Sequence, residues 1–113
     1  MSEHPVASDT LLIFCNTPDA DCAAKISREL VERRLAACVN ILAPCQSIYR
    51  WHGVVENAQE IPLVIKTTTE RYAELETVLR SLHPYEVPEI IALPIAAGLP
   101  AYLAWIAEET TAP

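Results

Sequence analysis

The 113-residue sequence has the length of one domain and a formal net charge of −7, with no run of Lys or Arg. An acidic surface repels phosphate backbones, so we expect no nucleic-acid partner, and no apolar run approaches the length of a membrane span. Apolar residues make up 51% of the chain, slightly above the usual range of about 45–50%, which in a small domain predicts a second buried surface and an oligomer.

The first two elements are predicted from a short apolar run and a helix start signal. Residues 10–15 form a run of the right length for a strand buried on both faces. After it, Thr17 can cap a helix, Pro18 suits the first helical position and Asp19 favours the positive end of the dipole. The helix should run to about Arg34, and its buried face should carry Ala23, Ile26 and Leu30.

A long β-hairpin is predicted within residues 36–69. Two arms rich in β-branched and aromatic residues flank Trp51-His52-Gly53, where Gly53 can adopt the positive φ of a tight turn. Pro44 and Pro62 each remove a ladder donor, so each should mark an edge, a bulge or a strand break. Because the hairpin is longer than a domain of this size can cover, we expect its outer part to contact another copy of the chain.

A second helix, a rigid connector, a last strand and a third helix complete the chain. Thr69 should cap the second helix, Pro84 should end it, and the two prolines of His83-Pro84-Tyr85-Glu86-Val87-Pro88 should hold the connector extended. A strand over residues 89–95 and a helix over 101–109 follow. The resulting order, β-α-β-β-α-β with a helical tail, predicts an α+β ferredoxin-like sandwich over residues 10–113. Helices would cover one face of its sheet, and the other, apolar face would need a cover from assembly.

The N-terminal residues predict a cytoplasmic protein, and this location predicts the state of the cysteines. Residues 1–9 have neither a basic start nor an apolar core, which predicts a disordered tail without a signal peptide, and His4 receives no role there. Disulfides are rare in the cytosol, so the four cysteines should be thiols. Their spacing invites a zinc hypothesis, but closely spaced C-x₂-C pairs do not occur. The cysteines are Cys15, Cys22, Cys38 and Cys45.

The sequence resembles the CutA family of divalent-cation-tolerance proteins in four blocks between about Leu11 and Ile106. These blocks are ERRLAACVNIL, SIYRWHGVVENAQEIPLVIKTT, LHPYEVPEIIALPI and GLPAYLAWI. The resemblance implies a homotrimer of ferredoxin-like protomers linked by strands that neighbours exchange. It also implies a role in tolerance to copper and other divalent metals, with no cofactor required for folding.

Cys15 and His83 are the candidate metal ligands. Cys15 closes the first strand and His83 follows a helix C-terminus, where a cation is favoured, and the ferredoxin-like topology could bring these ends together. Thiolate and imidazole suit copper or zinc, although a core cysteine and a helix-ending histidine are the simpler alternatives. The resemblance implies copper, because both residues match positions credited with copper binding in some members. Those members have a second His where this chain has Leu82, which predicts fewer ligands.

A second group of residues at hairpin and strand ends could form an inter-subunit pocket. Lys and Glu beside aromatic side chains could bind a small anion or act as an acid/base pair, but we favour an inter-subunit salt bridge because no activated nucleophile accompanies them. His52, at the hairpin tip, should be solvated. The pocket group is Trp51, Lys66, Tyr85, Glu86 and Glu89.

Three functions from different classes are compatible with these residues. The first, which we expect, is a non-catalytic, trimeric, copper-binding protein of metal-ion tolerance, whose partners are itself and metal ions. The second is a trimeric signalling module that resembles the PII-type regulators and binds a small ligand in inter-subunit clefts. The third is a small enzyme of unknown reaction.

Overall fold

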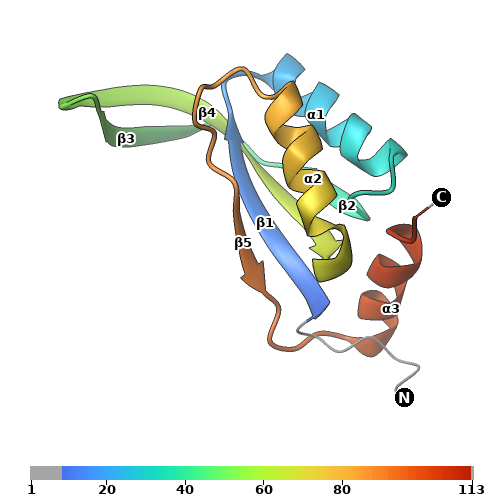
Figure 1. The fold of residues 1–113 in the computed structure, drawn as a ribbon. Helices are drawn as coiled ribbons and strands as arrows, with labels where there is room; N and C mark the ends of the chain where they lie inside the picture. The colour runs from blue at the N-terminus through green and yellow to red at the C-terminus, as the bar shows by residue number, and fades with distance from the viewer. Residues whose placement is uncertain (1–8, 113) are drawn as a thin grey trace.

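A computed structural model describes residues 9–112, in which helices cover one face of an antiparallel sheet (Figure 1). The strands run in the order β2-β4-β1-β5, with β3 paired to the outer part of β4, so the predicted ferredoxin-like arrangement is confirmed. Apart from Asp9, the expected tail with His4 lies outside the described residues. The elements are β1 (Thr10–Thr17), α1 (Ala20–Glu32), β2 (Cys38–Ile41), β3 (Cys45–Trp51), β4 (Val54–Thr68), α2 (Thr69–Leu82), β5 (Ile91–Pro94) and α3 (Pro100–Glu109).

The core lies between the sheet and helices α1 and α2. Alternate residues of β1, including Ile13 and Cys15, are almost fully buried, whereas Leu12 and Phe14 between them are only half-buried. The prediction of a strand buried on both faces is therefore wrong, because within one chain the two main helices cover a single face. The predicted apolar faces of the helices are confirmed, with Ala23, Ile26 and Leu30 of α1 and Leu75 and Leu79 of α2 buried.

Helix α1 begins two residues later than predicted. Asp19, and not Thr17, is the N-cap, and its Oδ1 accepts a hydrogen bond from the Cys22 backbone N at 2.8 Å. Thr17 instead continues β1, where it pairs with Ile61 and its Oγ1 donates to the Ile61 carbonyl oxygen at 2.9 Å. The long β1–β4 ladder thus takes the residue that local sequence offered as a cap. For α2, the N-cap is Thr68 in place of the predicted Thr69.

The β3–β4 hairpin turns on two residues with positive φ. His52 has φ 49° and Gly53 has φ 80°, which is the backbone pattern of a type I′ turn. The positive φ predicted for Gly53 is confirmed, and His52 shares it. The hairpin projects beyond the sandwich (Figure 1), and exposes Ile48, Val54 and Val55.

A β-bulge separates β2 from β3 where the hairpin leaves the body. Ile41 pairs with Leu63 and Cys45 pairs with Glu60, so the three residues 42–44 oppose the two residues 61–62. Pro44 lies in the bulge and Pro62 lies opposite it. The prediction that both prolines mark an edge, a bulge or a break is confirmed.

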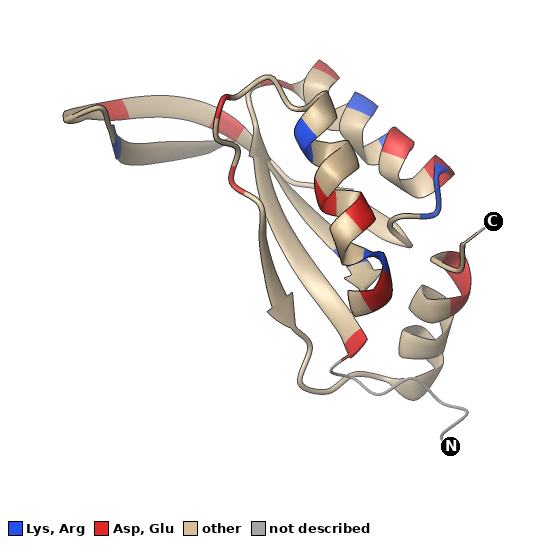
Figure 2. Ribbon diagram, in the orientation of Figure 1, with Lys and Arg blue, Asp and Glu red and all other residues tan. Residues whose placement is uncertain are grey.

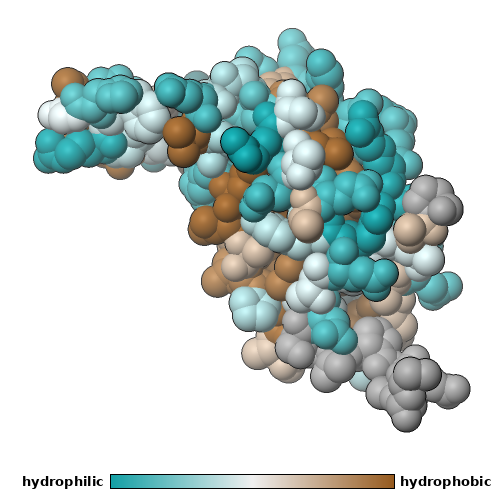
Figure 3. Space-filling model, in the orientation of Figure 1, coloured by the Kyte–Doolittle hydropathy of each residue, from teal (hydrophilic) through white to brown (hydrophobic). Residues whose placement is uncertain are grey.

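The sheet face opposite α1 and α2 is apolar, as predicted. Leu12 shares this face with Leu93, and Phe14 shares it with Val64 and Ile91, because directly paired residues point to the same side. Ile91 and Leu93 belong to the edge strand β5 and are exposed. Figure 3 shows apolar surface gathered along this edge, below the hairpin. The last strand is shorter than the predicted 89–95.

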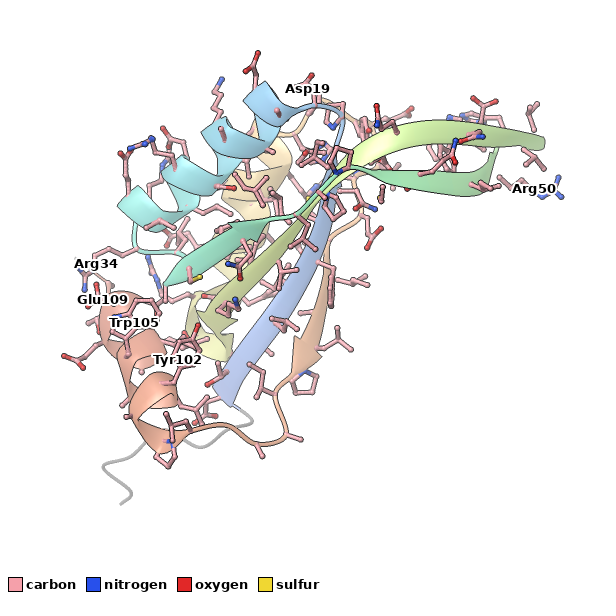
Figure 4. The ribbon with its side chains drawn as sticks, turned by 180° about the vertical axis from the view of Figure 1, so that it is seen from behind. Asp19, Arg34, Arg50, Tyr102, Trp105 and Glu109 are labelled. Carbon is pink, nitrogen blue, oxygen red and sulfur yellow. The ribbon has the colours of Figure 1, made fainter. Side chains whose placement is uncertain are left out.

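Helix α3 packs against β1 and β4 through Leu103 and Ile106. The Arg34 side chain binds the C-terminal end of α3 (Figure 4). Its Nε donates a hydrogen bond to the Thr111 carbonyl oxygen, and one terminal nitrogen donates a hydrogen bond to the Glu108 carbonyl oxygen, both at 2.9 Å. A cation at a helix C-terminus also complements the dipole. Within residues 9–112, no helix combines the length and apolar character needed to cross a bilayer.

Candidate functional site

His83 and Cys15 meet at one backbone carbonyl, where the end of α2 lies against the end of β1. His83 is 7% exposed, and its ring Nε2 lies 2.7 Å from the carbonyl oxygen of Asn16. The Tyr85 backbone N donates to the ring Nδ1 at 3.2 Å. Since Nδ1 accepts this bond, the ring proton lies on Nε2, which donates to Asn16. Both ring nitrogens are therefore used inside the protein.

The Cys15 thiol is buried beside this ring. Its residue is 1% exposed, and Sγ makes a weak contact with the same Asn16 carbonyl oxygen at 3.8 Å. Burial, followed by the negative charges of Glu89, Cys22 and Glu60, raises the pKa of Cys15 to about 12. Since metals and electrophiles react with the thiolate, any metal that binds Cys15 has to displace its proton.

The pair supplies the right donor types for copper but only two donors. Sulfur and imidazole nitrogen suit Cu(I), and imidazole suits either oxidation state. Within the described 104-residue span, 9–112, no group of three or more His, Cys, Asp or Glu is arranged to hold a metal ion. Leu82, next to His83, adds no donor. A metal at this pair would replace existing hydrogen bonds, which limits its affinity.

A cleft of about 620 Å³ opens where the hairpin leaves the body, on the other side of Asn16. It lies between β3, the end of β1 and the connector that follows α2. Four of the five predicted pocket residues line it: Trp51, Tyr85, Glu86 and Glu89. Figure 2 shows acidic segments of β4 and the connector gathered at this place.

Lys66, the fifth predicted pocket residue, lies elsewhere. It pairs across the sheet with Cys38 and Leu12, and its Nζ contacts the Asn40 Oδ1 and, at 3.9 Å, the Cys38 Sγ. The structure therefore does not bring a lysine next to Glu86 and Glu89. The anion site and the acid/base pair that we considered are not assembled within one chain.

Glu60 and Asn16 are cleft residues that sequence reasoning missed. Glu60 is 7% exposed, and its Oε2 accepts a hydrogen bond from the Tyr85 hydroxyl at 2.9 Å. Burial and the Glu60 carboxylate raise the pKa of Tyr85, so its phenol stays protonated and donates. Asn16 Nδ2 donates to the Glu89 Oε1 at 2.8 Å. Glu60 ends a polar stretch of the hairpin arm, so in the sequence it resembles a solvated residue. The only sequence feature that could have indicated a cleft residue was its position just before Ile61-Pro62.

Comparison with known proteins gives one consistent result. Residues 11–109 match the family described as CutA1 divalent ion tolerance protein. A divalent-cation tolerance protein CutA of Thermus thermophilus is 48% identical over 99 residues, which cover 88% of this chain and 96% of that protein. The crystal structure of CutA from Xylella fastidiosa has a TM-score of 0.90 at 49% identity, over 92% of this chain and 100% of that one. A structure described as the periplasmic divalent cation tolerance protein CutA from Archaeoglobus fulgidus has a TM-score of 0.87 at 37% identity, over 90% and 99%.

Proposed function

Because the chain belongs to the CutA1 divalent ion tolerance protein family, we propose that it acts in the tolerance of divalent metal ions and that copper is one of these metals. The observation that supports copper is the meeting of Cys15 and His83 at the Asn16 carbonyl. Binding there requires the loss of the Cys15 proton, so copper affinity should be modest and should decrease as the pH falls. Bound copper would be coordinated by the Cys15 sulfur and one His83 ring nitrogen. The fold of the chain holds these two donors close together.

Calorimetric titration of the reduced protein with Cu(I), Cu(II) and Zn(II) tests this proposal. Cys15→Ser and His83→Ala should each weaken copper binding, whereas Cys45→Ser, at the base of the hairpin, serves as a matched thiol control. Equal affinity in all variants would place the copper site elsewhere. A parent that binds no metal tighter than about 1 mM, or roughly −4 kcal/mol, would overturn the copper proposal.

We also propose a homotrimer in which the hairpin crosses between subunits. The proposal is supported by the uncovered apolar face with Ile91 and Leu93, and by the exposed apolar residues of the projecting hairpin. Sedimentation equilibrium should give about three times the 12.5 kDa chain mass. A stable folded monomer at micromolar concentration would overturn the proposal.

A cytoplasmic location is proposed from the cysteines. All four are free in the structure, which suits a reducing compartment. Fractionation of cells that express the full chain should recover it with cytoplasmic markers, and recovery with periplasmic or secreted ones would contradict the proposal.

A ligand-binding signalling module is the second candidate, favoured by the cleft. Its volume of about 620 Å³ lies within the range of about 300–1,000 Å³ typical of small-molecule sites. We propose binding and not catalysis, because Lys66 is separated from Glu86 and Glu89. A metabolite that raises the melting temperature of the metal-free protein would support this candidate.

A further inference from the structure

The cleft at the base of the hairpin carries charge of one sign only. Three carboxylates line it, from Glu60, Glu86 and Glu89, together with three aromatic rings, from Tyr49, Trp51 and Tyr85. No Lys, Arg or His of the described residues lines it. The walls are therefore acidic and aromatic at once, a combination that repels anions and attracts cations.

Glu60 is the residue that makes this more than a group of surface acids. It is more than nine-tenths buried, and among residues 9–112 its side chain accepts a hydrogen bond only from a neutral group, the Tyr85 hydroxyl. The ion pairs of the described residues all lie on α1 and α2, so none involves Glu60, Glu86 or Glu89. Burial of a carboxylate is costly unless a cation accompanies it, and buried acids are almost always paired. Within residues 9–112, no Lys, Arg or His thus accompanies the buried Glu60 carboxyl group.

Glu89 and the aromatic rings give the cleft a defined shape. The Asn16 side chain fixes Glu89 through its 2.8 Å hydrogen bond, and Tyr85 is fixed by Glu60. Aromatic faces attract ammonium and guanidinium groups, Trp most strongly. A bare metal ion would need several converging oxygen, nitrogen or sulfur donors, and no such group is present in residues 9–112. The cleft is also much larger than an ion needs.

We propose that this cleft binds an organic cation, a guanidinium or alkylammonium group on an apolar stem, between the carboxylates of Glu60 and Glu89 and the ring of Trp51. Two sources carry this chemistry. One is a free small molecule, and the other is an arginine side chain of a second copy. Arg50 is the only Lys or Arg between residues 45 and 60, and its exposed side chain lies at the hairpin tip (Figure 4), where one terminal nitrogen donates to the Gly53 carbonyl oxygen at 3.3 Å. The proposal holds whether or not copper binds at Cys15 and His83.

Tryptophan fluorescence tests the proposal in the full chain. Trp105, on α3, is replaced in the background variant Trp105→Phe, so that emission reports Trp51 in the cleft. Butylguanidinium and butylammonium are titrated up to about 10 mM, a range that detects weak binding. Butanol and inorganic phosphate are the neutral and anionic control probes. Saturable changes with the cations alone are expected.

Charge-neutral variants and an arginine variant decide the outcome. Glu60→Gln, which retains an acceptor for Tyr85, and Glu89→Gln should each weaken cation binding about tenfold, whereas the exposed Glu109→Gln should leave it unchanged. Cation binding that appears only with Arg50→Ala would identify Arg50 of a second copy as the resident cation and also supports the proposal. The proposal is overturned if neither background binds the cations, or if butanol or phosphate binds equally well. It is also overturned if Glu89→Gln, placed in the background that binds and correctly folded by circular dichroism, does not weaken binding.

Discussion

The imidazole of His83 donates its Nε2–H to the carbonyl oxygen of Asn16 over 2.7 Å, and this bond ties the end of α2 to the end of β1. The Asn16 side chain donates a hydrogen bond to Glu89, so one residue joins the buried histidine to the wall of the cleft. The contact therefore positions the connector between α2 and β5 as well as the helix end.

Replacement of His83 by Ala should destabilise the fold. It leaves the buried Asn16 carbonyl and the Tyr85 N–H without their partners, which should lower the free energy of unfolding by about 2–4 kcal/mol. Urea denaturation at fixed protein concentration measures this change. Arg80→Ala, at an exposed position of α2, is the control; equal midpoints for the two variants would contradict the assigned role.

The stability of the protein should decrease in alkali because of Cys15. Its pKa is about 12 in the folded protein and 9.0 in the unfolded reference, so the protonated thiol stabilises the fold fully below pH 9, and this contribution is lost as the pH rises toward 12. The loss should reach about 2.7 kcal/mol by pH 11. Unfolding free energies of the parent and of Cys15→Ala, measured from pH 8 to 11, isolate this contribution. Parallel curves for the two proteins would show that the thiol does not contribute.

Substitution of Gly53 by Ala should weaken the hairpin for a backbone reason alone. The added Cβ would meet no atom within 4 Å, but φ of 80° costs an L-residue about 1–2 kcal/mol. At Gly98, by contrast, the added Cβ would lie 3.0 Å from the Leu103 Cδ2, so Gly98→Ala acts through packing. Thermal unfolding and amide exchange of residues 45–60 should show local opening in Gly53→Ala only. Unchanged exchange there would contradict the strained turn.

Removal of the Arg34 side chain should loosen α3. Arg34→Ala deletes two hydrogen bonds to the last carbonyls of the helix, which should lower its local stability by about 1–3 kcal/mol. Amide exchange in residues 100–109 measures the effect. The neighbouring Arg33→Ala breaks only a surface pair with Glu29 and should leave α3 unchanged. Equal protection in both variants would refute the role of Arg34.

Local sequence signals predicted the elements well where one interaction dominated. The Gly53 turn, the two prolines at the bulge and the periodic helix faces each followed from a single steric or apolar rule. The α1 start did not, because Thr17 was a plausible cap until the ladder to Ile61 was known. A local sequence pattern contains no information about a pairing partner 44 residues away.

The candidate site was predictable in part for the same reason. Trp51, Tyr85, Glu86 and Glu89 lie at element ends, where clefts form, and they share one. Lys66 lies three residues before the α2 start and was also placed at an element end, but the sheet register puts it beside Cys38. Glu60 was missed because only the tertiary structure buries it. Burial of a polar residue in a hairpin arm depends on the connector that crosses it.

The one extra residue at 42–44 changes the alternation of side chains between β2 and β3. In β2, the even-numbered residues Cys38 and Asn40 lie on the helix-free side of the sheet. After the bulge, the odd-numbered Cys45 pairs with Glu60 on that same side, so the side chains on this side change from even to odd positions. Tyr49 and Trp51 line the cleft with Glu60 because their β4 partners, Glu56 and Val54, share its side, and Arg50 faces away. Exchange of Leu42 or Ala43 for another residue preserves the bulge, whereas deletion of either would leave two residues opposite residues 61–62 and join β2 and β3 into one regular strand. The pairing of β3 with β4 would not change, because the His52-Gly53 turn sets that register. The turn thus fixes which β3 side chains meet the cleft, and the length of residues 42–44 fixes the bulge at which the hairpin leaves the body.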